Sequence, residues 1–338
     1  MPGKAKLDPI NTALDLAYNT RPVTEALESI VNFRDVGQSL KDRSSHRSLP
    51  SSYIKIGRFF RSGRLDDATT GDLEILTKKY SIETIIDLRS EIEGEKSEGV
   101  QRAFPSSSVS ALTASDFAAP NRNNLESSFK GSRKDLIWTK EEGNRNTFYI
   151  NFAGTSFRFN SIWRRAPFAL KTKIAGWITV GQKVRAVRAV GETVLASRGL
   201  IGLNQDFLDF CGKAIVQAIR LIAEPDYKPV LLHCSPGKDR TGLVVALTLA
   251  LCSIPEDLIV ADYVKSQEGL EPQRDVMVKE MARQGLDSSF CDAPAEVIRG
   301  VLEYVREKYN GVDAYMERLG FTQADKDKLR KSLLAEGL

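Results

Sequence analysis

The segment that decides the fold is VLLHCSPGKDRTGLVV, residues 230–245. Its apolar start is typical of a buried strand, its apolar end is typical of a helix, and a short charged loop joins them. Successive backbone N–H groups in so short a loop point inward, and the following helix adds its free N–H groups and the positive end of its dipole. The segment therefore predicts a strand, loop and helix that hold an anion, with the thiol of Cys234 at the junction.

The side chains of this loop are suited to a phosphate. Five residues separate Cys234 from Arg240, whose planar guanidinium can hold two phosphate oxygens. Gly237 lets the chain curve tightly, and Thr241 can cap the helix or bond toward the thiol. The positive field of the loop also favours the ionised thiolate, which is a competent nucleophile. We therefore expect transfer of a phosphoryl group to Cys234 and then hydrolysis, with His233 orienting the loop.

Two other interpretations of the loop are weaker. A buried structural cysteine beside a surface arginine suits a single cysteine, but not the whole string H-C-x-x-G-x-x-R-T-G after an apolar strand. A sulfurtransferase of the rhodanese type also uses a cysteine loop, yet it does not require an arginine followed by Thr-Gly.

The residues predicted to bind the substrate are Ser235, Pro236, Gly237, Lys238, Thr241 and His233.

Patterns on both sides of the loop favour an α/β fold. Residues 54–65 and 81–90 contain short apolar runs that predict strands. Few strands and many helices predict a small central sheet flanked by helices. We expect one domain over the whole chain. Helices are predicted after the loop at residues 241–253, 256–267, 273–284 and 295–309, with prolines at their joints.

The string HCSPGKDRTG resembles the signature of the protein tyrosine phosphatase superfamily. Its GKDRTG form resembles an atypical branch that includes bacterial secreted tyrosine and phosphoinositide phosphatases and fungal relatives. Other segments resemble motifs of that branch: NFRDVG, GRFFRSGRL, IIDLRSEIEGE and YNGVDAYMERLGFT. The resemblance covers about residues 31–100 and 206–321, and it implies a cysteine-phosphatase fold that works through a phosphocysteine intermediate.

The general acid for the leaving group is a choice between two aspartates. The resemblance to the GKDR branch implies the loop residue Asp239. Asp87 is the second candidate, because it ends a predicted strand, and such ends open toward the ligand crevice of α/β folds. An ion pair with an internal arginine is the alternative for Asp87. Asp206 and Asp209 are interpreted as surface or capping residues.

An insertion at residues 104–200 lies outside the resemblance. Its first part, to about residue 146, is rich in Ser, Asn and Ala, which is typical of a loosely ordered stretch. Residues 143–191 contain nine Lys or Arg and neither Asp nor Glu. We favour a helical lid packed against the core, as occurs in the family, over an interfacial helix that contacts a membrane surface. A helix with an apolar stripe is predicted from Val180, Val184, Val187 and Val194.

Three charged residues stand in apolar surroundings near the start of the chain. They are Arg34, Asp35 and Arg61. Buried charges need partners, so we expect an ion-pair network that supports the loop. Direct contact with the substrate is the alternative for these residues.

Composition narrows the class of protein. The chain has 338 residues, of which 42% are hydrophobic and 27% charged, as in ordinary globular proteins. A net charge of +4 does not indicate nucleic-acid binding. Four scattered cysteines and two histidines disfavour disulfides and metal sites, so we expect neither metal nor cofactor. No leader and no long apolar run are visible, which favours the cytoplasm. No oligomeric state is predicted.

The leading prediction is a cysteine-dependent phosphatase that acts on phosphotyrosine proteins, with dual specificity included. A phosphoinositide phosphatase is the alternative, because Lys238 and the basic insertion could hold additional phosphates. A phosphate-binding pseudophosphatase or scaffold is less favoured, since Cys234, Asp239 and Arg240 are all intact.

Overall fold

A small mostly parallel sheet forms the centre of the molecule. The structure is a computed structural model that describes residues 27–44, 52–90, 93, 98–104, 145–224 and 229–336. Within this part, the sheet has the strand order β1-β3-β6-β4-β5, with β1 antiparallel to β3 and the other neighbours parallel. Its strands are β1 (Arg34–Asp35), β3 (Phe59–Ser62), β6 (Val230–His233), β4 (Thr84–Asp87) and β5 (Asn146–Tyr149). The predicted α/β class is confirmed.

The central strand β6 is buried on both faces. Leu231 lies opposite Phe60 of β3 and Ile85 of β4, and all three belong to one apolar cluster. The next residue, Leu232, points to the other face and joins the larger core cluster. A strand covered on both faces is apolar at every position, which is why VLL does not alternate with polar residues. The register also brings His233 beside Ser62 and Asp87, so three strands end together at the loop.

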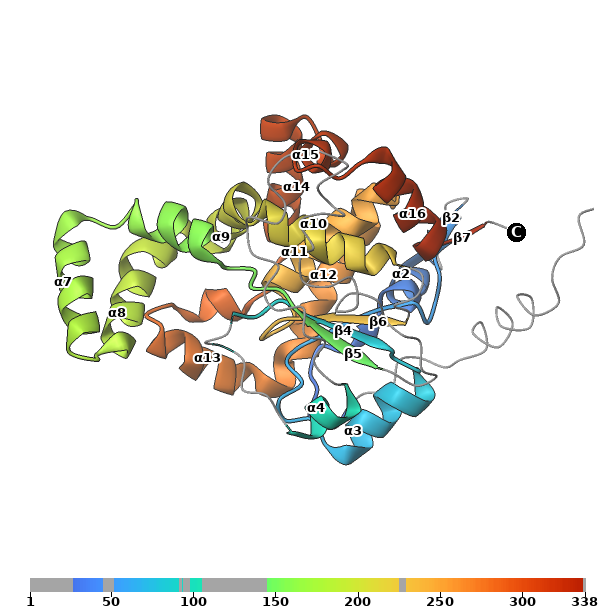
Figure 1. The fold of residues 1–338 in the computed structure, drawn as a ribbon, viewed down its shortest axis with the longest axis horizontal. Helices are drawn as coiled ribbons and strands as arrows, with labels where there is room; N and C mark the ends of the chain where they lie inside the picture. Colours follow the sequence, from blue (N-terminus) through green and yellow to red (C-terminus); the bar gives the residue numbers. More distant parts are fainter. Residues whose placement is uncertain are drawn as a thin grey trace, which may run out of the picture.

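Helices cover the two faces of this sheet unequally (Figure 1). The short helices α3 (Thr70–Glu74) and α4 (Glu98–Ala103) lie below it. The larger core lies above, under α10 (Gly212–Ala223), α11 (Asp239–Leu251), α12 (Glu256–Leu270) and α14 (Ala295–Tyr309). The helices predicted at 256–267 and 295–309 are α12 and α14, and α11 begins two residues earlier than predicted.

The remaining elements surround this centre. The other α-helices are α2 (Val36–Ser44), α6 (Thr155–Phe157), α7 (Phe168–Thr179), α8 (Lys183–Val190), α9 (Ala196–Phe210), α13 (Arg274–Arg283), α15 (Val312–Arg318) and α16 (Gln323–Leu333). Shorter helical turns are η1 (Ile75–Lys79), η3 (Arg158–Trp163), η4 (Gly191–Leu195), η6 (Glu271–Gln273) and η7 (Ser288–Cys291). A second, two-stranded sheet pairs β2 (Ser52–Ile54) with β7 (Leu334–Glu336). None of the described helices combines the length and apolarity needed to cross a bilayer.

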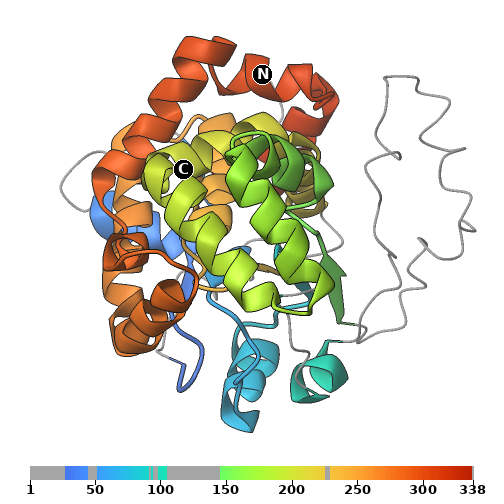
Figure 2. The same ribbon diagram turned by 90° about the vertical axis from the view of Figure 1, so that its left-hand side faces the viewer.

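Helices α7 and α8 form a hairpin that projects from the body (Figure 1) and faces the viewer in Figure 2. The hairpin has a small core of its own, made by Ala166, Leu170, Ile174, Ala186 and Val194. The predicted valine stripe does not pack as one surface: Val194 is buried, but Val180, Val184 and Val187 are exposed. The reason is that α7 and α8 cover each other along one side only, and the described residues do not cover the exposed valines on the other side. Residues 105–144 of the predicted insertion lie outside the described residues.

Candidate active site

The loop between β6 and α11 is held open from outside by donors that bind its carbonyl groups. Arg61 Nη2 donates to Gly237 O at 2.8 Å, and Asn32 Nδ2 donates to both Gly237 O and Pro236 O at 3.0 and 3.2 Å. The N–H of a trans peptide points away from its carbonyl oxygen. These bonds therefore turn the N–H groups of Gly237 and Lys238 toward the inside of the loop, where an anion would bind.

Gly237 is the position where the loop admits no side chain. Its φ is +69°, and a Cβ there would lie 1.9 Å from Ser62 O. The loop thus packs directly on the end of β3. Arg64 N adds a bond to Ser235 O at 2.9 Å, which fixes the other side of the curve.

A buried ion-pair network supports the loop, as the sequence predicts for Arg34 and Arg61. The acid that joins them is Asp262 of α12, which lies 2.9 Å from Arg34 Nε and 2.6 Å from Arg61 Nη1. Burial alone would raise the pKa of Asp262, but the two arginines hold it well below its ordinary value. Burial and Arg34 lower the pKa of Arg61 to about 10. Asp35 accepts hydrogen bonds from the backbone N–H groups of Gly57 and Gln38.

Arg240 is buried and is oriented by an acid that sequence analysis did not identify. Glu93 Oε2 accepts from Nη1 at 2.8 Å, and Glu93 Oε1 accepts from Nη2 at 2.6 Å. Leu88 O accepts a further bond from Nη1. Burial would raise the pKa of Glu93, but Arg240 and Ser90 lower it to about 2. Glu93 lies within the motif IIDLRSEIEGE, and this placement is the signal that could have singled it out.

The thiol of Cys234 contributes to the electrostatic field at Arg240. Burial lowers the pKa of Arg240, but Cys234 and Glu93 raise it above its ordinary value. Cys234 and Arg240 are thus near enough, at the end of β6, for their charges to interact. His233 Nδ1 lies 3.4 Å from Cys234 O, beside the loop.

The two candidate acids have different surroundings. Asp87 is buried and binds the guanidinium of Arg89 through both oxygens at 2.8–3.1 Å, which is the ion pair considered as its alternative. Burial would raise the pKa of Asp87, but His233 and Arg89 lower it. Asp239, the first residue of α11, keeps 18% of its side chain exposed, against 3% for Asp87. Of the two, only Asp239 meets solvent to a useful extent.

Lys238 and Thr241 differ from expectation. The Lys238 side chain is fully buried, and its ammonium lies 2.7 Å from Asp239 Oδ1, so it does not stand open above the loop. Within the described residues, Thr241 Oγ1 has no hydrogen-bond partner, so it neither caps α11 nor binds the thiol. A buried hydroxyl of this kind is a donor that remains for a bound anion.

The interpretation of Asp206 as a surface residue is wrong. Asp206 is fully buried in α9 and accepts from Ser161 Oγ and Arg165 Nη1, each at 2.6 Å, and from Arg198 Nη2 at 2.9 Å. Its partners come from segments before and after the hairpin, so Asp206 fastens the base of the hairpin to α9. Asp209 is half-buried, and its carboxylate accepts from the hydroxyls of Tyr304 and Tyr309.

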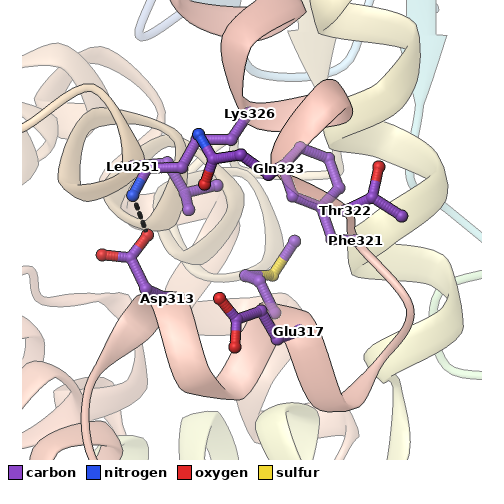
Figure 3. A pocket seen from close by; sticks show the side chains of 8 residues that line it. Leu251, Asp313, Glu317, Phe321, Thr322, Gln323 and Lys326 are labelled. Atoms are coloured by element: carbon purple, nitrogen blue, oxygen red, sulfur yellow. Dashed lines mark hydrogen bonds and ion pairs between the residues drawn. The ribbon is translucent and has the colours of Figure 1, made fainter.

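A pocket far from the loop is shown in Figure 3. It is lined by residues of α15, α16 and the far end of α11, with an ion pair between Lys326 and Asp313 at its edge. Because α11 separates Leu251 from the loop by about 20 Å at 1.5 Å per residue, this pocket is not part of the candidate active site.

Comparison with known proteins places these features in a family. The sequence model of the tyrosine phosphatase family matches residues 25–335. The triple specificity protein phosphatase PtpB of Mycobacterium tuberculosis is 31% identical over 138 residues, covering 36% of this chain and 49% of PtpB. A tyrosine-protein phosphatase of Nostoc commune is 28% identical over 126 residues, covering 35% of this chain and 43% of that protein. The chain therefore spans less than half the length of these two relatives.

Proposed function

The chain belongs to the tyrosine phosphatase family, and from this premise we propose that it hydrolyses phosphotyrosine in proteins through a phosphocysteine intermediate at Cys234. The observation that carries the proposal is the loop after β6. Its carbonyl groups are bound from outside, its N–H groups face inward, and Arg240 is fixed beside the thiol by Glu93. The same proposal includes dual specificity, which means that phosphoserine and phosphothreonine are also hydrolysed.

The proposed reaction has two steps. The Cys234 sulfur attacks phosphorus, and an S–P bond forms while the bond from phosphorus to the tyrosine oxygen breaks. Asp239 gives its proton to the leaving oxygen. Water then attacks phosphocysteine and returns a proton to Asp239, and the products are inorganic phosphate and the free thiolate. Arg240 and the loop N–H groups stabilise the charge on the phosphoryl oxygens in both steps.

The reaction is tested with p-nitrophenyl phosphate, without added metal and in the presence of a chelator. We expect hydrolysis that vanadate blocks, and we expect Cys234→Ser to abolish turnover while substrate still binds. Cys252→Ser, at the opposite end of α11, is the matched control and should retain activity. Turnover by Cys234→Ser would show that another group is the nucleophile.

The choice of acid is tested with substrates whose leaving groups differ in pKa. Each candidate has an ion-pair partner, Lys238 for Asp239 and Arg89 for Asp87, and Asp239 is proposed because its side chain is the more exposed of the two. Asp239→Asn should lose most activity on the poorest leaving groups, and Asp87→Asn should lose activity evenly over the series. An even loss in Asp239→Asn would reject Asp239 as the acid.

Phosphoinositides are the second proposed substrate class. The observation that favours them is the projecting hairpin, where basic and exposed apolar side chains occur together. A panel of phosphoinositides beside phosphotyrosine peptides tests this proposal, and absence of lipid turnover would remove it. A cytoplasmic location is also proposed, because the four cysteines are buried and form no disulfide, as is typical of reducing compartments.

A further inference from the structure

The end of the α7–α8 hairpin carries aliphatic side chains that are exposed in the described part of the chain. We define the hairpin tip as Ile178, Val180, Val184 and Val187. Their exposed fractions are 54%, 66%, 73% and 53%. Val184 and Val187 lie one turn apart on α8, and Ile178 and Val180 stand where α7 ends. The four residues thus lie at the end of α7 and in α8, on either side of the turn that joins the two helices.

The charge around this tip has one sign. Helices α7 and α8 and their turn carry five basic residues and no acidic residue. The basic residues are Lys171, Lys173, Lys183, Arg185 and Arg188. The first acid, Glu192, stands at the base and pairs with Arg188 at 2.8 Å. A surface that is both apolar and basic is complementary to a layer of anionic headgroups above acyl chains.

The base of the hairpin is fixed to the body, while its tip stands clear. A Cβ on Gly191 would lie 1.7 Å from Gln284 O, so the chain after α8 rests directly on the end of α13. Asp206 binds Arg165 before α7 and Arg198 after α8. Figures 1 and 2 show the rest of the hairpin projecting from this seat. The tip is thus presented in a defined direction.

The hairpin begins on the side of the sheet where the candidate active site lies. The chain leaves the carboxyl end of β5 at Tyr149 and proceeds through α6 and η3 to α7. Strands β4, β5 and β6 are parallel, so the loop with Cys234 follows the same end of the sheet. The hairpin and the loop with Cys234 therefore follow the same end of the sheet.

We propose that the α7–α8 hairpin docks the protein on an anionic lipid bilayer, with the hairpin tip among the headgroups and its basic residues on lipid phosphates. The tip offers four exposed aliphatic groups, and Trp177 beside them is partly buried against the hairpin core. So small an end buries little area on a protein, yet it enters a headgroup layer readily. This inference extends the proposed function. It depends on that function only for its consequence, which is that docking brings Cys234 near lipid headgroups. Binding itself requires no catalysis.

The test is sedimentation of the full chain with vesicles of phosphatidylcholine alone and with phosphatidylserine added. We expect binding to the anionic vesicles and weak binding to the neutral ones. Lys183→Glu with Arg185→Glu should weaken binding at least 25-fold, because each basic residue near an anionic surface contributes about fivefold. Val180→Ser with Val184→Ser should also weaken it. The matched control is Lys328→Glu with Lys331→Glu on α16, at the opposite side of the molecule, which should bind as the wild type does.

Several results would overturn the proposal. They are absence of wild-type binding, equal loss in the α16 control, and unchanged binding of the hairpin variants. Dimerisation through the tip without vesicle binding would assign the surface to a second copy. If the hairpin variants changed the turnover of p-nitrophenyl phosphate but not vesicle binding, the hairpin would act as a lid and not as a membrane contact. Hydrolysis of that soluble ester is measured for every variant, so failure of the phosphatase reaction is distinguished from failure of docking.

Discussion

In the proposed reaction, Glu93 sets the orientation in which Arg240 would bind the phosphate. Its carboxylate binds the Nη1 and Nη2 end of the guanidinium at 2.8 and 2.6 Å. A guanidinium has five N–H donors, so the Nε side remains for a second anion. Glu93 thus acts as a positioning residue for the proposed reaction, through the orientation of Arg240.

Glu93→Gln keeps the shape of this contact and removes its charge. We expect kcat/KM for p-nitrophenyl phosphate to fall about tenfold, because a hydrogen bond between charged groups contributes about 1.5–3 kcal/mol and only part of it survives. The inhibition constant of vanadate should rise in parallel, which a purely structural defect would not require. Glu74→Gln, which loses an exposed ion pair with Lys78, is the control. Faster turnover in Glu93→Gln would show that Glu93 instead competes with the phosphate.

The carboxylate of Asp262 is the counter-ion of two buried arginines, Arg34 and Arg61. Asp262→Asn should lower the free energy of unfolding by about 3–5 kcal/mol, because it leaves Arg34 and Arg61 buried without a counter-ion. Urea unfolding measures this loss. Asp257→Asn, exposed on the same helix, should cost less than about 1 kcal/mol. Equal stability of the two variants would contradict the assignment of the network to Asp262.

The pH dependence of unfolding follows from the same group. The folded-state pKa of Asp262 lies below its ordinary value of 3.8. The unfolded chain therefore binds the proton first, and the stability that Asp262 contributes is complete above pH 3.8 and is lost as the pH falls further. The wild type should lose stability over this range more steeply than Asp262→Asn.

At the scale of elements, the strand, loop and helix around Cys234 were predictable because their information is local. An apolar run, a glycine and a second apolar run define β6 and α11 within one short segment. The partners of the loop were not predictable in this way. Glu93 meets Arg240 across 147 residues, and Arg34 meets Asp262 across 228, so only the folded chain shows which charges pair.

The glycine of this loop provides a prediction for the element itself. In Gly237→Ala, the new methyl group would collide with Ser62 O, and φ would have to leave its value of +69°. We expect kcat to fall about 100-fold, the typical effect of displacing one N–H that stabilises a transition state. Gly71→Ala on α3, where the nearest atom would be 3.7 Å away, should retain activity. Full activity of Gly237→Ala would show that the loop tolerates a displaced backbone.

At the scale of the whole molecule, the apolar interior is divided. The main cluster joins α10, α11, α12 and α14, whereas the hairpin has a separate small cluster around Leu170 and Ile174. Helical periodicity in the sequence predicted the helical character of this region. It could not predict that Val184 and Val187 face outward, because the same spacing results whether a stripe meets the core or water.

This division predicts uneven stability. The amides of α7 and α8 should exchange with solvent faster than those of α11, because the few apolar contacts of the hairpin allow it to open without unfolding the main core. Hydrogen exchange followed by mass spectrometry measures this difference. Helix α14 is the control: it is also amphipathic, but Val301 and Val305 pack in the main cluster, so it should be protected like α11. If α7 and α8 were protected as strongly as α14, the hairpin would open only with the whole molecule. A hairpin that opens alone can adapt to a bilayer while the loop that holds Cys234 stays intact. Whether the hairpin opens separately from the main core therefore decides whether the proposed docking and catalysis can proceed independently.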